Sequence, residues 1–436
     1  MNYRDNLKRL TFFAIFTIFS TVFCYSQVVK QSAPYENKLL NGLKLFVWTD
    51  PTAEKVSVKL RIHSGAAFDP KDKMGVMALL GEILFPSEQS RDFFTEDLEG
   101  NLDITTTYDY IQITATGKSS EILSIIETIS KAVVTPQVTA ENFKLVQTAR
   151  IKKVQEMEKN PNYLADRAVA KRLLGEFPYG RTAEGTTESL SKIDRADILF
   201  AKERFLSSDN ASITFVGNVK PDFVYRATRQ LFGNWTKSDK KIPATFTMPN
   251  EPDLTPQKID FTPAEANLSS AFEIRFATRG FARNDKDYWA IRFLADVLQN
   301  RFRSQFDTRL NDSVSVVHER NLLPSLLNFK ISVRMADIVD PSKGGKIDLT
   351  ANPTETLRVP ISTAEFEQTR AKILGEIDQK PMADKTLDVI TYKLGTVKDE
   401  IQRLNSVTQA DLQRVADKLA KQTFVSVTVA PASNKQ

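Results

Sequence analysis

The protein has 436 residues, and its 59 Lys and Arg against 54 Asp and Glu give a formal net charge of +5 at pH 7. This near-neutral balance, without a basic stripe interleaved with aromatic residues, argues against a nucleic acid as partner. The length is ample for two domains, and a single cysteine, Cys24, excludes a fold held by internal disulfides.

The N-terminal segment reads as a secretory signal peptide over residues 1–26. A basic start is followed by the apolar run Leu10–Phe23 and by a small-x-small cleavage site that ends at Ser26. The run is short for a membrane span. We therefore expect an exported protein of the periplasm or cell envelope with no membrane span. A lipid anchor on Cys24 is the alternative, which the bulky Phe23 disfavours.

The mature chain opens with strand signals and continues through alternating strands and helices. Asn41-Gly42 predicts a turn before a strand over residues 43–48, and apolar residues alternate along Lys55–Ile62 as in a half-buried strand. Further strands are expected at 102–108, 110–116 and 211–216, and helices at 91–98, 119–133, 139–159, 161–174 and from 194 onward.

The helix predicted over Gly75–Phe85 organises this first part of the chain. Its apolar residues recur at i, i+3, i+4, i+7 and i+8, namely Val76, Leu79, Leu80, Ile83 and Leu84. Ala78, Gly81 and Glu82 share a second face, which we expect to be exposed. That spacing suits two metal ligands and a general base, but these positions carry a methyl group, a hydrogen and one carboxylate.

A proline-rich stretch over residues 235–256 has few core residues and is predicted to link two domains, 27–234 and 257–436. Its prolines are Pro243, Pro249, Pro252 and Pro256.

The second half repeats the first at a constant offset of 214 residues, which carries Asp194 onto Thr408. The matching segments are 193–198 with 407–412, 212–214 with 426–428, 58–62 with 272–276, and 79–84 with 293–298. We therefore predict an α+β fold of two tandem homologous domains, each a mostly antiparallel sheet with helices on one face. A helix of the second copy is expected to be shortened or replaced by a loop within 336–360.

The Gly75–Phe85 helix and its flanks resemble the insulinase-like zinc peptidases, a family that includes the mitochondrial processing peptidases. The resemblance covers nearly the whole mature chain, and the segments that carry it include Leu39–Lys44, Phe177–Arg181 with Gly185-Thr186, Phe205–Gly217 and Leu231–Trp235. The resemblance implies two such domains per chain, forming half of a clamshell, with pairs of chains closing around an internal chamber.

The family's helix reads His-x-x-Glu-His, and this motif falls on Ala78, Gly81 and Glu82. The third zinc ligand of the family, a Glu, falls on Lys153. All four positions are changed, so the resemblance implies no catalytic residue, no metal ligand and no cofactor. We expect Lys153 to stand near the former metal position and pair with Glu82. The alternative is that both side chains simply face solvent.

The resemblance supplies one candidate substrate-binding residue, Arg309. The family's second domain carries an Arg that holds the peptide backbone, with a Tyr a few residues on that here falls on Val316. A solvated arginine is the alternative. The two histidines, His63 and His318, have no His or Cys at ligand spacing and are expected to be ordinary strand-end or surface residues.

Together these features favour a non-catalytic subunit of an exported zinc peptidase. Its partner would be an active chain of the same family, the pair forming a heterodimer that holds peptide substrates. The alternative is a stand-alone envelope scaffold or peptide-binding protein without a peptidase partner. An active metallopeptidase in its own right is the third hypothesis, which the changed motif disfavours.

Overall fold

A computed structural model describes residues 33–238, 242, 252–261, 271–334 and 352–431. The predicted signal peptide and Cys24 lie outside these residues. Within them, no helix is both long and apolar enough to cross a membrane.

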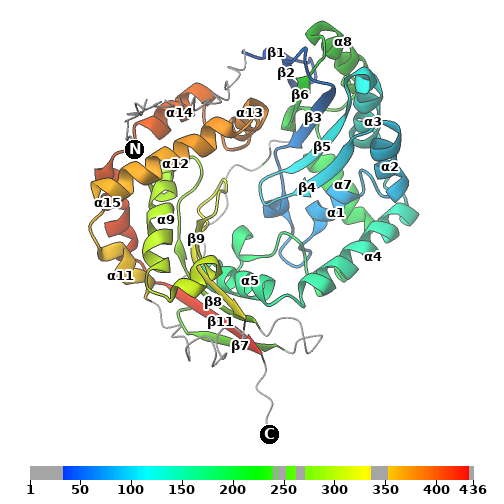
Figure 1. The fold of residues 1–436 in the computed structure, drawn as a ribbon. Helices are drawn as coiled ribbons and strands as arrows, with labels where there is room; N and C mark the ends of the chain where they lie inside the picture. The colour runs from blue at the N-terminus through cyan, green and yellow to red at the C-terminus, as the bar shows by residue number, and fades with distance from the viewer. Residues whose placement is uncertain (1–32, 239–241, 243–251, 262–270, 335–351, 432–436) are drawn as a thin grey trace, which may run out of the picture. The chain divides into compact units, whose positions relative to one another are not determined.

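The first sheet has six strands in the order β1-β2-β6-β3-β5-β4 (Figure 1). The strands are β1 Tyr35–Lys38, β2 Lys44–Thr49, β3 Lys55–Ile62, β4 Asn101–Thr106, β5 Ile111–Lys118 and β6 Ala211–Gly217. Only β2 and β6 run parallel, and every other neighbouring pair is antiparallel.

The second sheet has five strands in the order β7-β11-β8-β10-β9. The strands are β7 Gln257–Phe261, β8 Ala271–Arg279, β9 Val314–His318, β10 Leu326–Arg334 and β11 Val425–Pro431. Here too a single pair is parallel, β7 with β11.

The two sheets confirm the predicted duplication. The order β2-β6-β3-β5-β4 in the first copy is repeated as β7-β11-β8-β10-β9 in the second, with the parallel pair at the same place. Both ends of β6 and β11 differ by the predicted 214 residues. The fold is therefore two copies of one α+β unit with a mostly antiparallel sheet.

The helices follow the same repeat. In the first half they are α1 Val76–Glu82, α2 Glu88–Asp92, α3 Ile122–Val134, α4 Ala140–Met157, α5 Pro161–Leu174, α6 Thr187–Lys192, α7 Arg195–Phe205 and α8 Pro221–Phe232. In the second half they are α9 Tyr288–Arg303, α11 Pro353–Arg358, α12 Thr363–Gln379, α13 Met382–Thr391, α14 Val397–Asn405 and α15 Gln409–Leu419. Asp194 caps α7 and Thr408 caps α15, each in a reciprocal capping box with the Asp three residues later.

The two faces of the first sheet have different coverings. Val56, Val58, Leu60 and Ile62 of β3 join the first hydrophobic core, which contains buried residues of α1, α3, α7 and α8. Because side chains alternate along a strand, Lys59 and Arg61 lie on the opposite face. There they meet α13, a helix of the second half.

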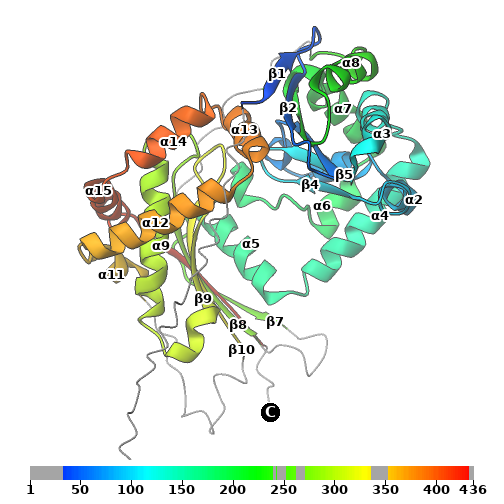
Figure 2. The same cartoon turned by 45° about the horizontal axis from the view of Figure 1, so that its top comes forward.

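Just as α13 of the second half lies on the first sheet, α5 of the first half packs on β8 and β11 of the second sheet (Figures 1 and 2). Its Ala165, Val169 and Leu173 share a core with Val427 and Val429 of β11. Each sheet thus has one face covered by its own copy and the other by a helix of the other copy. This exchange ties the halves together, and the repeat pattern alone does not predict it.

Element boundaries differ from the predictions in a few places. The helix expected at 91–98 is instead α2 followed by a π-helical turn at Phe93–Asp97. Trp235, where the predicted linker begins, is buried in the first core. Of the predicted linker, 239–241 and 243–251 lie outside the described residues, as do 336–351 of the segment expected to be trimmed.

Candidate functional site: a peptidase-like motif helix with a buried arginine

Helix α1 is fixed at its start by a buried carboxylate. Asp69 accepts hydrogen bonds from the backbone N–H groups of Gly75, at 2.7 Å, and Met77, at 2.8 Å. Gly75 has φ of 100°, a left-handed conformation that favours glycine. Burial raises the pKa of the Asp69 carboxyl to about 7, against the opposing effect of the two hydrogen bonds. The helix therefore begins at a well-defined point, and its side-chain directions follow.

The predicted apolar stripe is buried throughout, at Val76, Leu79 and Leu80 of α1 and at Ile83 and Leu84 directly after it. The face expected to be exposed is largely buried as well. Ala78 is 1 % exposed, and a Cβ added to Gly81 would lie 2.7 Å from Thr106 Oγ1 of β4. The same Cβ would lie 3.3 Å from Ile111 Cγ2 of β5. The expectation of an exposed motif face was wrong, because α1 packs against the sheet on this side too.

Glu82 ends the helix and pairs with Arg150 of α4, not with Lys153. Arg150 Nη1 donates to Glu82 Oε1 at 2.9 Å, Nη2 contacts Glu184 Oε2, and Nε donates to the Glu184 carbonyl at 3.1 Å. The arginine is 5 % exposed. One buried guanidinium thus holds two carboxylates from separate parts of the chain.

The predicted pair of Glu82 with Lys153 was therefore wrong, for a geometric reason. The buried residues of α4 are Val146, Arg150 and Val154, spaced four apart along one stripe. Lys153 lies beside that stripe and its side chain is exposed. The four-residue spacing of Val146, Arg150 and Val154 was the signal in the sequence that could have identified Arg150 as the inward-facing cation.

These residues do not fit a zinc ion. A zinc site needs three protein ligands with free lone pairs, whereas Ala78 and Gly81 offer none and Glu82 is already bound by a guanidinium. Nor do the described residues contain any group of three or more His, Cys, Asp or Glu side chains placed to hold a metal.

Both histidines lie at strand ends and are held by hydrogen bonds. His63 follows β3, with Nδ1 3.0 Å from Thr391 Oγ1 and Nε2 3.0 Å from Ser212 Oγ. His318 ends β9 and its Nε2 accepts from the Phe281 N–H at 3.1 Å. Burial lowers both pKa values to about 3, so both rings are neutral at physiological pH.

Arg309 lies in a 3₁₀ turn, Thr308–Ser313, between α9 and β9. Val316 lies in β9 opposite Phe329 and is buried. The substrate-binding role of Arg309 stays a prediction.

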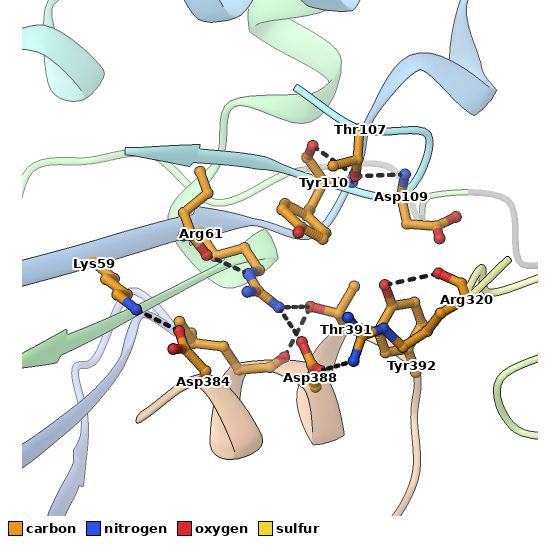
Figure 3. A network of polar contacts seen from close by, with 12 residues as sticks. Lys59, Arg61, Thr107, Asp109, Tyr110, Arg320, Asp384, Asp388, Thr391 and Tyr392 are labelled. Carbon is orange, nitrogen blue, oxygen red and sulfur yellow. Dashed lines mark hydrogen bonds and ion pairs between the residues drawn. The ribbon is translucent and has the colours of Figure 1, made fainter. Parts of the chain in front are cut away.

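A network of polar contacts between the halves was missed by sequence reasoning (Figure 3). Arg61 Nη1 of β3 lies 2.9 Å from Asp388 Oδ1 of α13, and its guanidinium stacks 4.1 Å above the Tyr110 ring. Lys59 pairs with Asp384 at 2.5 Å. The paired residues stand more than 300 positions apart, so no local pattern could have revealed them.

Asp109 contributes to the same network and should make stability depend on pH. Its carboxylate accepts from the Tyr179 hydroxyl at 2.6 Å and from the Leu322 N–H at 2.9 Å. Burial raises the pKa of Asp109 to about 6, against about 3.9 in an unfolded chain. The folded state therefore keeps this proton at pH values where the unfolded state loses it. The stability from this group is full below pH 4 and is lost as the pH rises through 6.

We therefore expect the wild type to lose up to about 3 kcal/mol relative to Asp109→Asn between pH 4 and pH 7. Urea unfolding of both proteins at each pH measures this difference. A difference that stays flat, or grows in favour of the wild type, would contradict the assignment.

The fold and this site define a peptidase-like chain whose motif helix lacks zinc ligands. Residues 45–187 match the family described as "Insulinase (Peptidase family M16)", and residues 192–373 match "Peptidase M16 inactive domain". The chain belongs to peptidase family M16.

Solved structures of related proteins have a similar fold. A crystal structure of a protease from Helicobacter pylori has a TM-score of 0.77 at 16 % identity, covering 91 % of this chain and 99 % of that one. At this identity the match shows the fold alone.

An uncharacterized zinc protease of Rickettsia felis is 18 % identical, over 48 % of this chain and 53 % of its own length. Cytochrome b-c1 complex subunit 1 of Saccharomyces cerevisiae is 27 % identical, over 42 % of this chain and 40 % of its own length. The chain thus spans about half the length of the curated relatives that it matches.

Proposed function

We propose that this protein is a non-catalytic member of peptidase family M16 that pairs with an active chain of the family. The observation that carries the proposal is the buried contact of Arg150 with Glu82 and Glu184. A positive charge fixed beside the motif helix opposes cation binding there, and Glu82 and Glu184, both held by Arg150, are not free to activate water.

The cytochrome b-c1 relative supports the proposal of an assembly partner. By its name that protein is a subunit of a larger complex, so the family fold serves in at least one multi-chain setting. The pair would enclose a chamber for peptide substrates, and the predicted signal peptide would place it in the periplasm or cell envelope. Arg309 is our candidate for contacting a peptide carbonyl or carboxylate there.

A stand-alone scaffold or peptide-binding protein is the second candidate function. It is favoured by a pocket in the second half that is lined by four cations, Arg283, Arg320, Lys380 and Lys385.

The proposal predicts a stable heterodimer with an intact family member from the same organism. A complex with an interface of at least about 1,000 Å² should remain associated during size-exclusion chromatography, and light scattering gives its mass. We expect hydrolysis of a quenched fluorescent peptide only when both chains are present.

A partner variant whose catalytic Glu is changed to Gln serves as control and should abolish hydrolysis while preserving the complex. Failure of the two chains to associate would favour the stand-alone function. Chelator-sensitive hydrolysis by the purified chain, with about one zinc bound per chain, would overturn both.

A further inference from the structure

A small pocket in the second half is lined by apolar and cationic side chains together. It has a volume of about 40 Å³ and lies among α12, α13, α14 and the start of α9. Its apolar residues are Trp289, Ile377, Val389, Val397, Ile401 and Leu404. Its cationic residues are Arg283, Arg320, Lys380 and Lys385, and its two carboxylates are Asp388 and Glu400.

Asp388 is already shared among three cations. Its Oδ1 lies 2.9 Å from Arg61 Nη1, its Oδ2 contacts Lys380 Nζ, and Arg320 Nη1 lies 3.8 Å from Oδ2. Figure 3 shows Arg61 and Arg320 approaching this carboxylate from the first sheet and from the segment after β9.

Glu400 is likewise shared, between Arg283 Nη1 at 2.7 Å and Arg403 Nη1 at 2.6 Å. Two carboxylates therefore serve five cations, of which Arg283, Arg320 and Lys380 line the pocket, and Lys385 is the fourth cation of its lining. The positive charge is in excess where solvent is partly excluded, which is the condition under which an additional anion is attracted.

Arg283 supplies a second, independent sign of a missing acceptor. The residue is 6 % exposed, and its guanidinium lies 4.2 Å from the Tyr288 ring centre and 4.9 Å from that of Trp289. Its buried Nε has no hydrogen-bond partner among the described residues. Buried N–H groups are usually satisfied, so this donor beside the pocket is available to a bound acceptor.

The surroundings of Lys380 disfavour its charged form. Burial lowers the pKa of the Lys380 ammonium, and Arg320 lowers it further, while Asp388 opposes both. A bound anion would stabilise the charged ammonium.

We propose that this pocket binds a carboxylate attached to a short apolar chain. The carboxylate would sit among the cations, within reach of Arg283 and Arg320. Because about 40 Å³ leaves no room for the chain as well, the hydrocarbon would extend outward over the exposed Ile401. Two sources share this chemistry, a free short-chain carboxylic acid and the C-terminal residue of a peptide that ends in an apolar side chain. The inference goes beyond the proposed pairing and is tested on the chain alone.

Isothermal titration calorimetry of the mature protein at low salt tests the proposal with three probes. They are N-acetyl-Gly-Ser-Gly-Leu with a free carboxylate, the same peptide as its C-terminal amide, and 4-methylpentanoate. We expect the free-carboxylate peptide to bind at least about tenfold more tightly than the amide. Equal affinity for 4-methylpentanoate and the peptide would identify the free acid as a sufficient ligand. No binding, or equal binding of acid and amide, would overturn the proposal.

Two variants place the binding in this pocket. Arg320→Gln, at a half-exposed side chain, should weaken carboxylate binding about tenfold. Ile401→Asp should weaken it at least as much by repelling the anion and removing apolar contact. Arg358→Gln on α11 is the matched control, because Arg358 is exposed and outside the pocket.

Thermal unfolding of each variant shows whether the fold is retained. Unchanged affinity in both folded pocket variants would overturn the proposal. Should Ile401→Asp fail to fold, Arg320→Gln alone decides.

Discussion

The triple variant Ala78→His, Gly81→Glu, Glu82→His is expected to lose stability and to gain no chelator-sensitive peptidase activity. A side chain at position 81 would begin 2.7 Å from Thr106 Oγ1, so the sheet or the helix must shift. Overpacking of this kind costs about 1–3 kcal/mol. Changing Glu82 also removes one of the two carboxylates that hold the buried Arg150, which adds a comparable cost. Urea unfolding and a peptide-hydrolysis assay with added zinc measure the two outcomes.

A glycine in an open helical position provides the control for this experiment. Gly375 in α12 has no atom within 4 Å of an added Cβ. Gly375→Ala should therefore stabilise the protein by about 1 kcal/mol, because alanine is the better helix former. Gly81→Ala should instead be destabilising. A triple variant as stable as the wild type would show that the motif face has room for the family's residues, and zinc-dependent activity would show that the site is restorable.

The repeat and the fold class could be predicted from the sequence because they depend on periodic patterns of residues. Alternation along β3 and the capping residues Asp194 and Thr408 are local signals, and the structure has them where the pattern indicates. The constant offset then carries one copy onto the other, so the second sheet follows from the first.

The contacts between distant segments were not open to the same reasoning. The pair of Arg61 with Asp388 depends on which face of β3 meets α13, and no local spacing encodes that. The partner of Glu82 could have been predicted, because the buried stripe through Val146 and Val154 indicates Arg150. Lys153 was chosen instead because it matches the position of the family's third ligand. The helical periodicity of α4 shows that this position does not face the core.

Arg150→Met is expected to destabilise the protein by about 3–5 kcal/mol, because it leaves Glu82 and Glu184 without their shared guanidinium. Methionine approximates the length of the arginine stem, so most of the loss reflects the two carboxylates rather than a cavity. Equilibrium unfolding in urea measures the change. Lys153→Met, one turn further along the exposed side of α4, is the matched control and should stay within about 0.5 kcal/mol of the wild type.

A double-mutant cycle separates the buried ion pair from general damage to α4. Glu82→Gln in the Arg150→Met background should cost much less than Glu82→Gln alone, because its charged partner has already been removed. Additive costs would mean that Arg150 and Glu82 do not interact energetically. A loss in Lys153→Met as large as that in Arg150→Met would restore the lysine as the cation beside the motif helix. Either result would remove the buried arginine as the physical reason for a motif that cannot hold zinc.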